Sequence, residues 1–275
     1  MFLASPLLLL TLPFLVVFYL SVQPYFNSYL LVVRGLSVQS SAYILNTFSL
    51  TSAVSSFIVS ILIKLTNRYK WYVFAGSCLY MLGTGLMMHF RTETSSIASI
   101  VGSQFLIGFG GGMLNVPAQL GVQASASHQE LAQATAMFLT MISIGGAIGS
   151  AISGAVWSKQ IPAKLEKYLP EDLRDEAMPI FQSITTAMEY EPGSPARVAI
   201  NRSYQETMTT LLTIALCMCA PVILCSLLMS DYKLDEIGQG VKGRVIGGQV
   251  DENEKKKDTP SVVDRIVAWI RTRKA

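Results

Sequence analysis

The stretch LAQATAMFLTMISIGGAIGSAISGAVWS, residues 131–158, contains no Lys, Arg, Asp, Glu or His. A helix needs about 20 apolar residues to cross the hydrocarbon of a bilayer, and one charge at its centre costs roughly 2.5 to 3.5 kcal/mol on insertion scales. Five further windows are equally free of these residue types: 1–33, 35–63, 71–88, 94–127 and 207–230. The sequence therefore predicts an all-α membrane protein with six transmembrane helices.

The composition agrees with this fold class. Hydrophobic residues make up 51% of the 275 residues and charged residues 14%, whereas a soluble domain is about 25% charged. All 21 Lys and Arg lie outside the six windows, so the net charge of +3 implies no nucleic-acid surface. The apolar start resembles a secretory signal, but it lacks a basic leader and continues to Val33, which favours a membrane span. The cysteines fall inside the windows and are interpreted as core residues: Cys78, Cys217, Cys219 and Cys225.

Basic residues in the connections predict the topology. The short connection at 64–70 holds Lys64, Arg68 and Lys70 and no acidic residue, which is typical of the cytoplasmic side. Both termini are then inside. The predicted organisation is five spans within 1–158, an extracellular or luminal loop at 159–206, a sixth span at 207–230 and a cytoplasmic tail at 231–275.

The long loop and the tail have patterns of their own. Apolar spacing in the loop predicts short amphipathic helices that could act as a lid, with Pro162 and Pro170 at helix starts and EPGSP at 191–195 as a break. In the tail, residues 261–273 have an apolar face, Trp269 and a basic end, which favours an interfacial helix. A loosely structured tail is the alternative.

The fourth window has the most polar face. Gln104, Gly108, Gly111, Asn115 and Gln119 recur at helical spacing and fall on one stripe. Amides at membrane depth need hydrogen-bond partners or water. We interpret the stripe as the lining of a cavity, and hydrogen bonding between helices is the alternative. Small residues also recur at helical spacing in other windows, which predicts close helix packing: Ser49, Ala53, Ser56, Ser60, Gly145 and Gly149.

Three parts of the chain resemble the C-terminal portion of the fungal siderophore-iron transporters of the major facilitator superfamily. They are QPYFNSYLLVVRGLS at 23–37, GFGGGMLNVPAQLGVQA at 108–124 with the following 134–170, and YEPGSPARVAINRSYQETM at 190–208. The first stretch matches the family at Tyr25, Phe26, Ser28, Tyr29 and Leu30. It departs from the family at Gln23-Pro24, where an acidic residue is common. The second stretch is also similar to drug:proton antiporters.

The resemblance implies that the six helices form one half of a major facilitator superfamily fold. Such transporters have twelve or more helices and hold the solute between two halves that rock against each other. We therefore expect this chain to be a C-terminal half or a fragment, whose partner is an N-terminal half of six or eight helices. We also expect a multi-pass protein of the plasma membrane, rather than of endosomal or vacuolar membranes.

The solute that the resemblance implies is a ferric siderophore, which is bulky and polar. Tyr25 and Tyr29 offer aromatic faces and hydroxyls, and Gln104, Asn115 and Gln119 offer amides, so we expect these five residues to line the substrate site. For the two tyrosines, an aromatic belt at the membrane interface is the alternative. No cofactor, metal site or catalytic constellation is expected.

The resemblance also implies proton symport. The windows contain no titratable acid or histidine, and His89, His128 and Glu130 lie at helix ends. The proton carrier is therefore expected in the other half or at the cavity rim, and this half alone is not expected to drive uphill transport. Two alternatives remain at this point: half of a multidrug:proton antiporter, and a non-transporting partner subunit.

Overall fold

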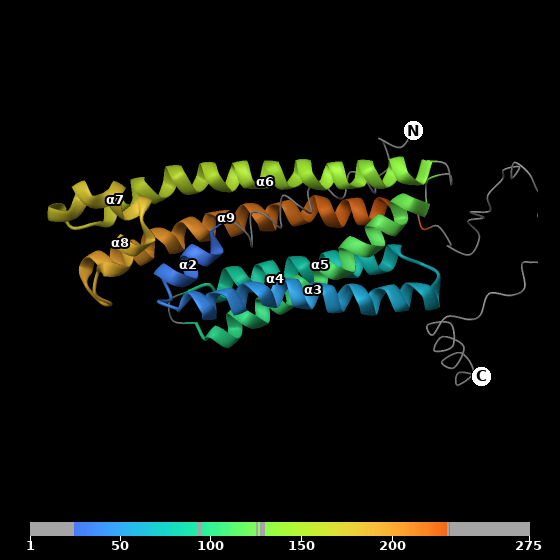
Figure 1. Ribbon diagram of the computed structural model, residues 1–275, viewed down its shortest axis with the longest axis horizontal. Helices are drawn as coiled ribbons and strands as arrows, with labels where there is room; N and C mark the ends of the chain where they lie inside the picture. Colours follow the sequence, from blue (N-terminus) through green and yellow to red (C-terminus); the bar gives the residue numbers. More distant parts are fainter. Residues whose placement is uncertain (1–24, 93–94, 125, 127–129, 230, 232–275) are drawn as a thin grey trace, which may run out of the picture.

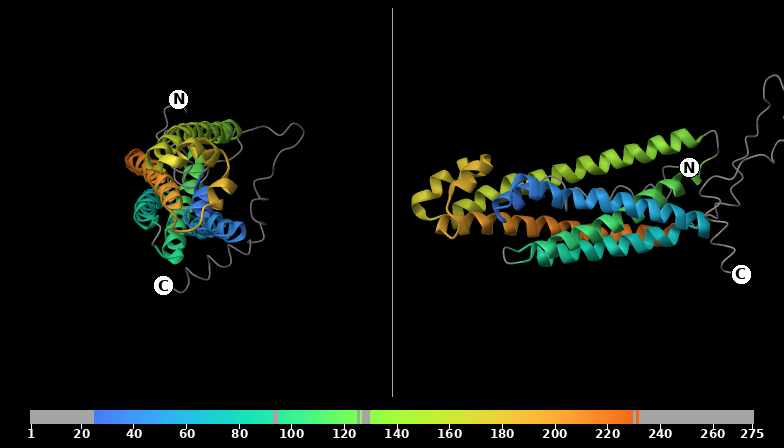
Figure 2. Two further views of the ribbon diagram at one scale, coloured as in Figure 1. Left: turned by 90° about the vertical axis from the view of Figure 1, so that its left-hand side faces the viewer. Right: turned by 60° about the horizontal axis from the view of Figure 1, so that its bottom comes forward.

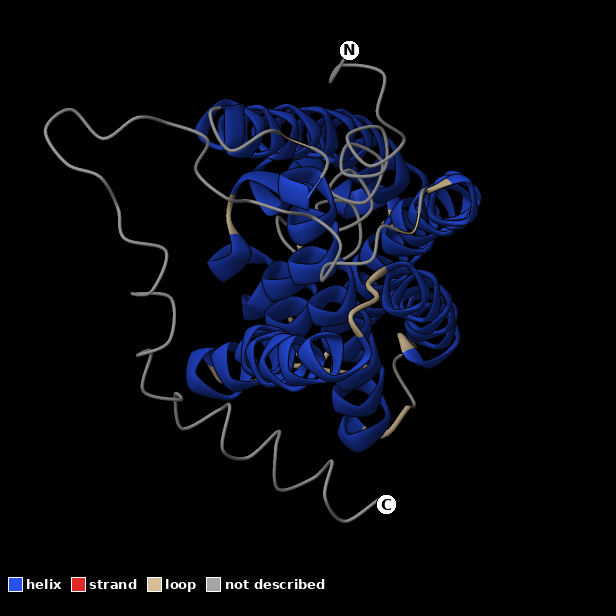
Figure 3. Cartoon of the chain, turned by 90° about the vertical axis from the view of Figure 1, so that its right-hand side faces the viewer, coloured by secondary structure: helices blue, strands red, loops and turns tan. Residues whose placement is uncertain are grey.

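The computed structural model describes residues 25–92, 95–124, 126, 130–229 and 231. These residues form helices joined by short connections, and no strand occurs among them (Figure 3). Most of the first expected span, the tail at 232–275 and its expected interfacial helix at 261–273 lie outside the described residues. The elements are α2 (Phe26–Val32), α3 (Val38–Thr66), α4 (Lys70–Phe90), α5 (Ile97–Ala124), α6 (Leu131–Tyr168), η3 (Glu171–Glu176), α7 (Ala177–Gln182), α8 (Ile184–Glu189) and α9 (Pro195–Leu228).

Five of these helices are long and apolar enough to cross a bilayer: α3, α4, α5, α6 and α9. Helices α3, α4, α6 and α9 run along roughly one direction, and α5 crosses the bundle obliquely (Figures 1 and 2). The predicted class, an all-α multi-pass membrane protein, is confirmed. Of the expected first span, the described part of the chain contains only α2.

Capping residues fix the ends of two long helices. The Ser37 side chain accepts the N–H of Ser40 at the start of α3, and Asn67 ends that helix in the left-handed region at φ 55°. At α9, the Ser194 side chain accepts the N–H of Arg197, and Pro195 occupies the first turn. The break expected at 191–195 therefore coincides with a helix start.

Helices α6 and α9 extend into the range 159–206 that we expected to be a loop. Helix α6 continues to Tyr168, so Pro162 lies inside it and not at a helix start. Its buried residues Ile161 and Leu165 continue the apolar face past the first charged residues. With 38 residues, α6 is about 57 Å long, against about 30 Å of hydrocarbon. A helix of this length exceeds the hydrocarbon thickness, and its charged end at 159–168 is the part expected beyond the hydrocarbon, where charges are tolerated.

The segment between these two helices, residues 169–194, is named the outer cap here, and the end of the bundle at which it lies is named the outer end, after the extracellular or luminal side expected from the sequence. It consists of η3, α7 and α8. Figure 1 shows it at one end of the bundle, beside α2. Its helices are only six residues long, and Ala177, Ile180 and Ala187 in them are buried.

Helix α5 lies against both α3 and α4, and glycines permit the close approach. A Cβ at Gly110 would stand 2.6 Å from the backbone N of Tyr80 on α4. A Cβ at Gly108 would stand 2.7 Å from the carbonyl O of Phe48 on α3. These distances are too short for any side chain, so the two contacts require glycine.

A hydroxyl also joins α3 to α5. Ser55 is fully buried and donates a hydrogen bond of 2.7 Å to the carbonyl of Phe109. We expect Ser55→Ala to lower the free energy of unfolding by about 0.6 kcal/mol, the average for hydrogen bonds between membrane helices, and by no more than about 1.7 kcal/mol, the maximum. The matched control is Ser60→Ala, because the exposed Ser60 hydroxyl donates within its own helix to Ser56. Unfolding in mixed detergent measures the free energy of unfolding of both variants. Equal decreases for the two would contradict a stabilising hydrogen bond between Ser55 and Phe109.

The expected core position of the cysteines is wrong for two of them. Cys219 is buried and Cys225 is half-buried, but Cys78 and Cys217 are exposed on the bundle surface. Cys78 and Cys217 lie on the outward faces of α4 and α9. In a membrane protein both the outward face and the core hold apolar residues, so the residue type alone does not show which of the two a cysteine occupies. All four are free thiols.

Candidate functional site

The predicted Tyr25 lies in an aromatic cluster near the outer end of the bundle. Its ring stacks on that of Trp157 on α6, with centroids 4.2 Å apart and 11° between the planes. Trp157 meets Tyr204 of α9 edge to face at 5.3 Å. Tyr25 is half-buried, whereas the other two rings are buried. This aromatic cluster of Tyr25, Trp157 and Tyr204 therefore connects the start of α2 with the two longest helices.

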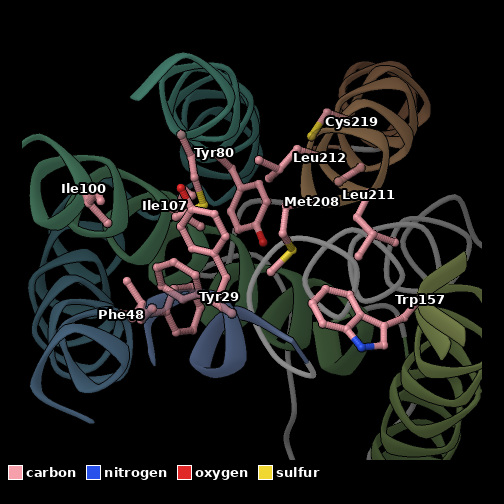
Figure 4. Packing of buried hydrophobic residues seen from close by; sticks show 14 of the residues in the cluster. Tyr29, Phe48, Tyr80, Ile100, Ile107, Trp157, Met208, Leu211, Leu212 and Cys219 are labelled. Atoms are coloured by element: carbon pink, nitrogen blue, oxygen red, sulfur yellow. The ribbon is translucent and has the colours of Figure 1, made fainter. Parts of the chain in front are cut away.

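Tyr29 is fully buried in the core, where Figure 4 shows it together with Phe48 and Tyr80. Its ring centre is 5.6 Å from the Arg91 guanidinium carbon. A tyrosine of an interfacial belt keeps its polar end in the headgroup region. Complete burial does not fit that alternative for Tyr29, and it also leaves Tyr29 without a surface for a solute in this conformation.

Arg91 is a buried charge that the sequence analysis did not select. It lies directly after α4, is 3% exposed, and places its guanidinium carbon 4.1 Å from the ring centre of Phe26. It also donates to the sulfur atoms of Met87 at 2.9 Å and Met208 at 3.7 Å. Burial lowers the pKa of Arg91 to about 9, so the group remains charged at neutral pH. Aromatic faces and polarisable sulfur stabilise this cation.

The predicted stripe on α5 does not form one continuous lining. Gln104 is fully buried, Gln119 is half-buried and Asn115 is exposed. Within the described residues, neither amide atom of Gln104 has a hydrogen-bond partner. Helix α5 crosses α3 and α4 obliquely (Figure 1), so one face of it passes from the packed interior to the surface. Gln104 and Gln119 are also about 22 Å apart along the helix axis.

Polar side chains join α6 to α9 beyond the apolar windows. Glu206 accepts from Arg202 at 3.0 Å and from the Tyr168 hydroxyl at 3.1 Å, and lies 3.8 Å from the Lys164 ammonium. The Arg202 guanidinium carbon is 4.3 Å from the ring centre of Tyr168. The sequence analysis assigned these residues to a loop, so it missed that they face each other across two helices.

Metal binding has no support in this part of the chain. Over the described residues, no group of three or more His, Cys, Asp or Glu is arranged to hold a metal ion. The polar groups that meet between α6 and α9 are those of Lys164, Tyr168, Arg202 and Glu206. In this structure these groups contact one another and link α6 to α9.

Comparison with known proteins identifies the family. The Major Facilitator Superfamily profile matches residues 1–156. Siderophore iron transporter mirC of Emericella nidulans is 56% identical over 222 residues, which are 81% of this chain and 37% of that protein. MFS siderochrome iron transporter C of Aspergillus fumigatus is 54% identical over the same share of this chain and 36% of its own length. Siderophore iron transporter 1 of Schizosaccharomyces pombe is 38% identical over 70% of this chain and 31% of its own.

These relatives are transporters by name, and the chain spans little more than a third of the length of the first two. The superfamily profile covers more than half of the 275 residues, and its match agrees with the bundle of long apolar helices. The chain therefore belongs to the Major Facilitator Superfamily.

Proposed function

We propose that this chain is the C-terminal six-helix half of a ferric-siderophore transporter that works by proton symport. The observation that carries the proposal is the 56% identity, over 81% of the chain, to a protein named as a siderophore iron transporter. The solute then lies between this half and an N-terminal half of six or eight helices, and alternating access exposes it to each side in turn. The plasma membrane is the proposed location.

We assign the five candidate residues to two roles within this transporter. Asn115, Gln119 and the half-buried Tyr25 present polar or aromatic surface and contact the solute directly. Tyr29 and Gln104 are fully buried and come into contact with it only when α2 and α5 move apart during the transport cycle. The Gln104 amide, which has no partner among the described residues, supports this role. A buried amide without partners costs about 1 to 3 kcal/mol and gains by pairing in another state.

The proton carrier is assigned to the other half or to the cavity rim. No acidic residue or histidine lies in the uncharged windows, and Glu206 lies at the outer end of the apolar part of α9, paired with Arg202. A carboxylate held by a guanidinium and a phenol favours its ionised form. Glu206 therefore suits a structural link between α6 and α9 better than reversible protonation.

A chimera tests the proposed function. The matched segment of mirC is replaced by this chain, and uptake of radioactive iron as a siderophore complex is measured in yeast without its own siderophore transporters. We expect uptake to be retained. A chimera that reaches the membrane and confers drug resistance without iron uptake would support the multidrug alternative instead.

Within this chimera, Asn115→Leu is expected to raise the KM for the siderophore about 2- to 10-fold, the equivalent of one lost neutral hydrogen bond. Asn115→Gln keeps an amide and is expected to stay within about twofold of the parent. Initial uptake rates over a range of siderophore concentrations provide the measurement. An unchanged KM for the leucine variant would remove Asn115 from the site.

A further inference from the structure

Arg197 joins three helices at the outer end of the bundle. It lies in the first turn of α9, is 7% exposed, and donates through Nη1 to the carbonyl of Ala187 on α8. Through Nη2 it donates to the carbonyl of Val32, the last residue of α2, at 2.5 Å. The same side chain therefore contacts the outer cap and the helix that carries the candidate tyrosines.

The two acceptors explain why an arginine is needed. Both carbonyls belong to the last turn of a short helix, where carbonyl groups lack partners within the helix. A guanidinium has a planar fork of donors and can serve both carbonyls at once, whereas an ammonium is a single point charge. Removal of the Arg197 side chain would leave the buried carbonyls of Ala187 and Val32 without this donor.

Helix α2 has further polar connections that do not involve the outer cap. Asn27 of α2 accepts from the Ser41 hydroxyl of α3. Arg34, just after α2, donates to the carbonyls of Thr92 at 3.1 Å and Ser95 at 2.6 Å, in the connection between α4 and α5. Helix α3 and the connection between α4 and α5 thus also hold α2, and Arg197 links it to the outer cap.

We propose that Arg197 is a positioning residue that couples the outer cap to α2. A displacement of the cap is transmitted through the Arg197 fork to the end of α2, and from there to Tyr29 in the core and Tyr25 in the aromatic cluster. The coupling itself stands on the geometry of this chain. Its effect on siderophore transport rests on the proposed function.

Hydrogen exchange of the full chain in lipid nanodiscs tests the coupling without any solute. In Arg197→Gln, we expect backbone amides of both 184–190 and 29–33 to exchange at least tenfold faster than in the parent. The control Arg202→Gln changes an exposed residue of the same helix that pairs with Glu206. It is expected to leave both segments unchanged.

Faster exchange in the outer cap alone would overturn the proposal, because it would indicate a purely local role at the start of α9. Arg197→Lys keeps the charge and covers the case in which the glutamine variant does not fold. It is expected to protect one segment fully and the other only in part, since its three N–H donors lie on one nitrogen, which cannot occupy the positions of both Nη atoms. Full protection of both segments by lysine would contradict the need for a fork.

Transport kinetics in the mirC chimera separate this proposal from the proposed function. If both hold, Arg197→Lys raises the KM for the siderophore at least threefold at unchanged surface expression, and Arg202→Gln does not. A parent chimera without uptake would reject the proposed function while the exchange data still report on the coupling. If the parent chimera takes up the siderophore but Arg197→Gln leaves hydrogen exchange at 29–33 unchanged, the coupling is rejected and the proposed function stands.

Discussion

Gly112→Val is expected to prevent assembly of the helix bundle. A Cβ at Gly112 would overlap the carbonyl O of Ser52, and it would stand 2.9 Å from both the Cβ of Ser55 and the backbone N of Ser56. All three atoms belong to α3, and two are backbone atoms that no rotamer change can move. Helix α3 would have to shift away from α5, which would also break the hydrogen bond from Ser55 to Phe109. We expect the yield of monodisperse protein to fall at least tenfold.

The matched control lies on the same helix. A Cβ at Gly102 would have no heavy atom of a neighbouring element within 4 Å, so the side chain of Gly102→Val meets open space. We expect its yield to equal that of the parent, measured as the monodisperse peak of a fluorescent fusion in size-exclusion chromatography. Similar yields for the two valine variants would mean that α3 and α5 are not in the close contact described here.

Trp157→Ala is expected to have the second largest effect. Trp157 is 7% exposed and holds the aromatic cluster together, because its ring contacts both Tyr25, just before α2, and Tyr204 of α9. Truncation of a buried aromatic side chain to alanine typically costs about 3 to 5 kcal/mol. The substitution also removes the surface on which Tyr25 stacks. Because Tyr25 is a proposed contact of the solute, we also expect the KM of the mirC chimera for the siderophore to rise.

The control for this prediction is a tryptophan on the bundle surface. Trp71 of α4 is 59% exposed, and Trp71→Ala is expected to cost less than about 1 kcal/mol. Trp157→Phe retains a ring for stacking and is expected to fall between the parent and the alanine variant. Unfolding in mixed detergent measures the loss of unfolding free energy for each of the three variants. A loss for Trp157→Ala no larger than that for Trp71→Ala would contradict the packing of the cluster.

The sequence predicted the membrane helices well because a charge in hydrocarbon is costly, so charge-free windows mark where lipid surrounds the chain. The same reasoning failed at the outer ends of α6 and α9. A window ends at the first charge, Lys159 or Glu206, but a helix that leaves the hydrocarbon continues for as long as packing supports it. Hydropathy describes the solvent around a segment and not the length of its helix.

The candidate site was predictable only in part. Helical spacing correctly placed Gln104 and Asn115 on one face, but it contains no information on what that face meets, and the two residues differ from fully buried to exposed. Arg197 illustrates the remaining difficulty, since its acceptor Val32 is 165 residues away in the sequence. Such a contact depends on how the helices assemble, and no local pattern encodes it.

The outer ends of α6 and α9 have a practical consequence for electron cryomicroscopy. The part of α6 from Lys159 to Tyr168 adds about 15 Å to the helix, and the outer cap lies at the same end of the molecule. A transporter enclosed by its micelle offers few landmarks by which particle images can be aligned. Here a helical projection marks one end of the bundle, so the orientation of each particle is expected to be recoverable without an attached antibody fragment.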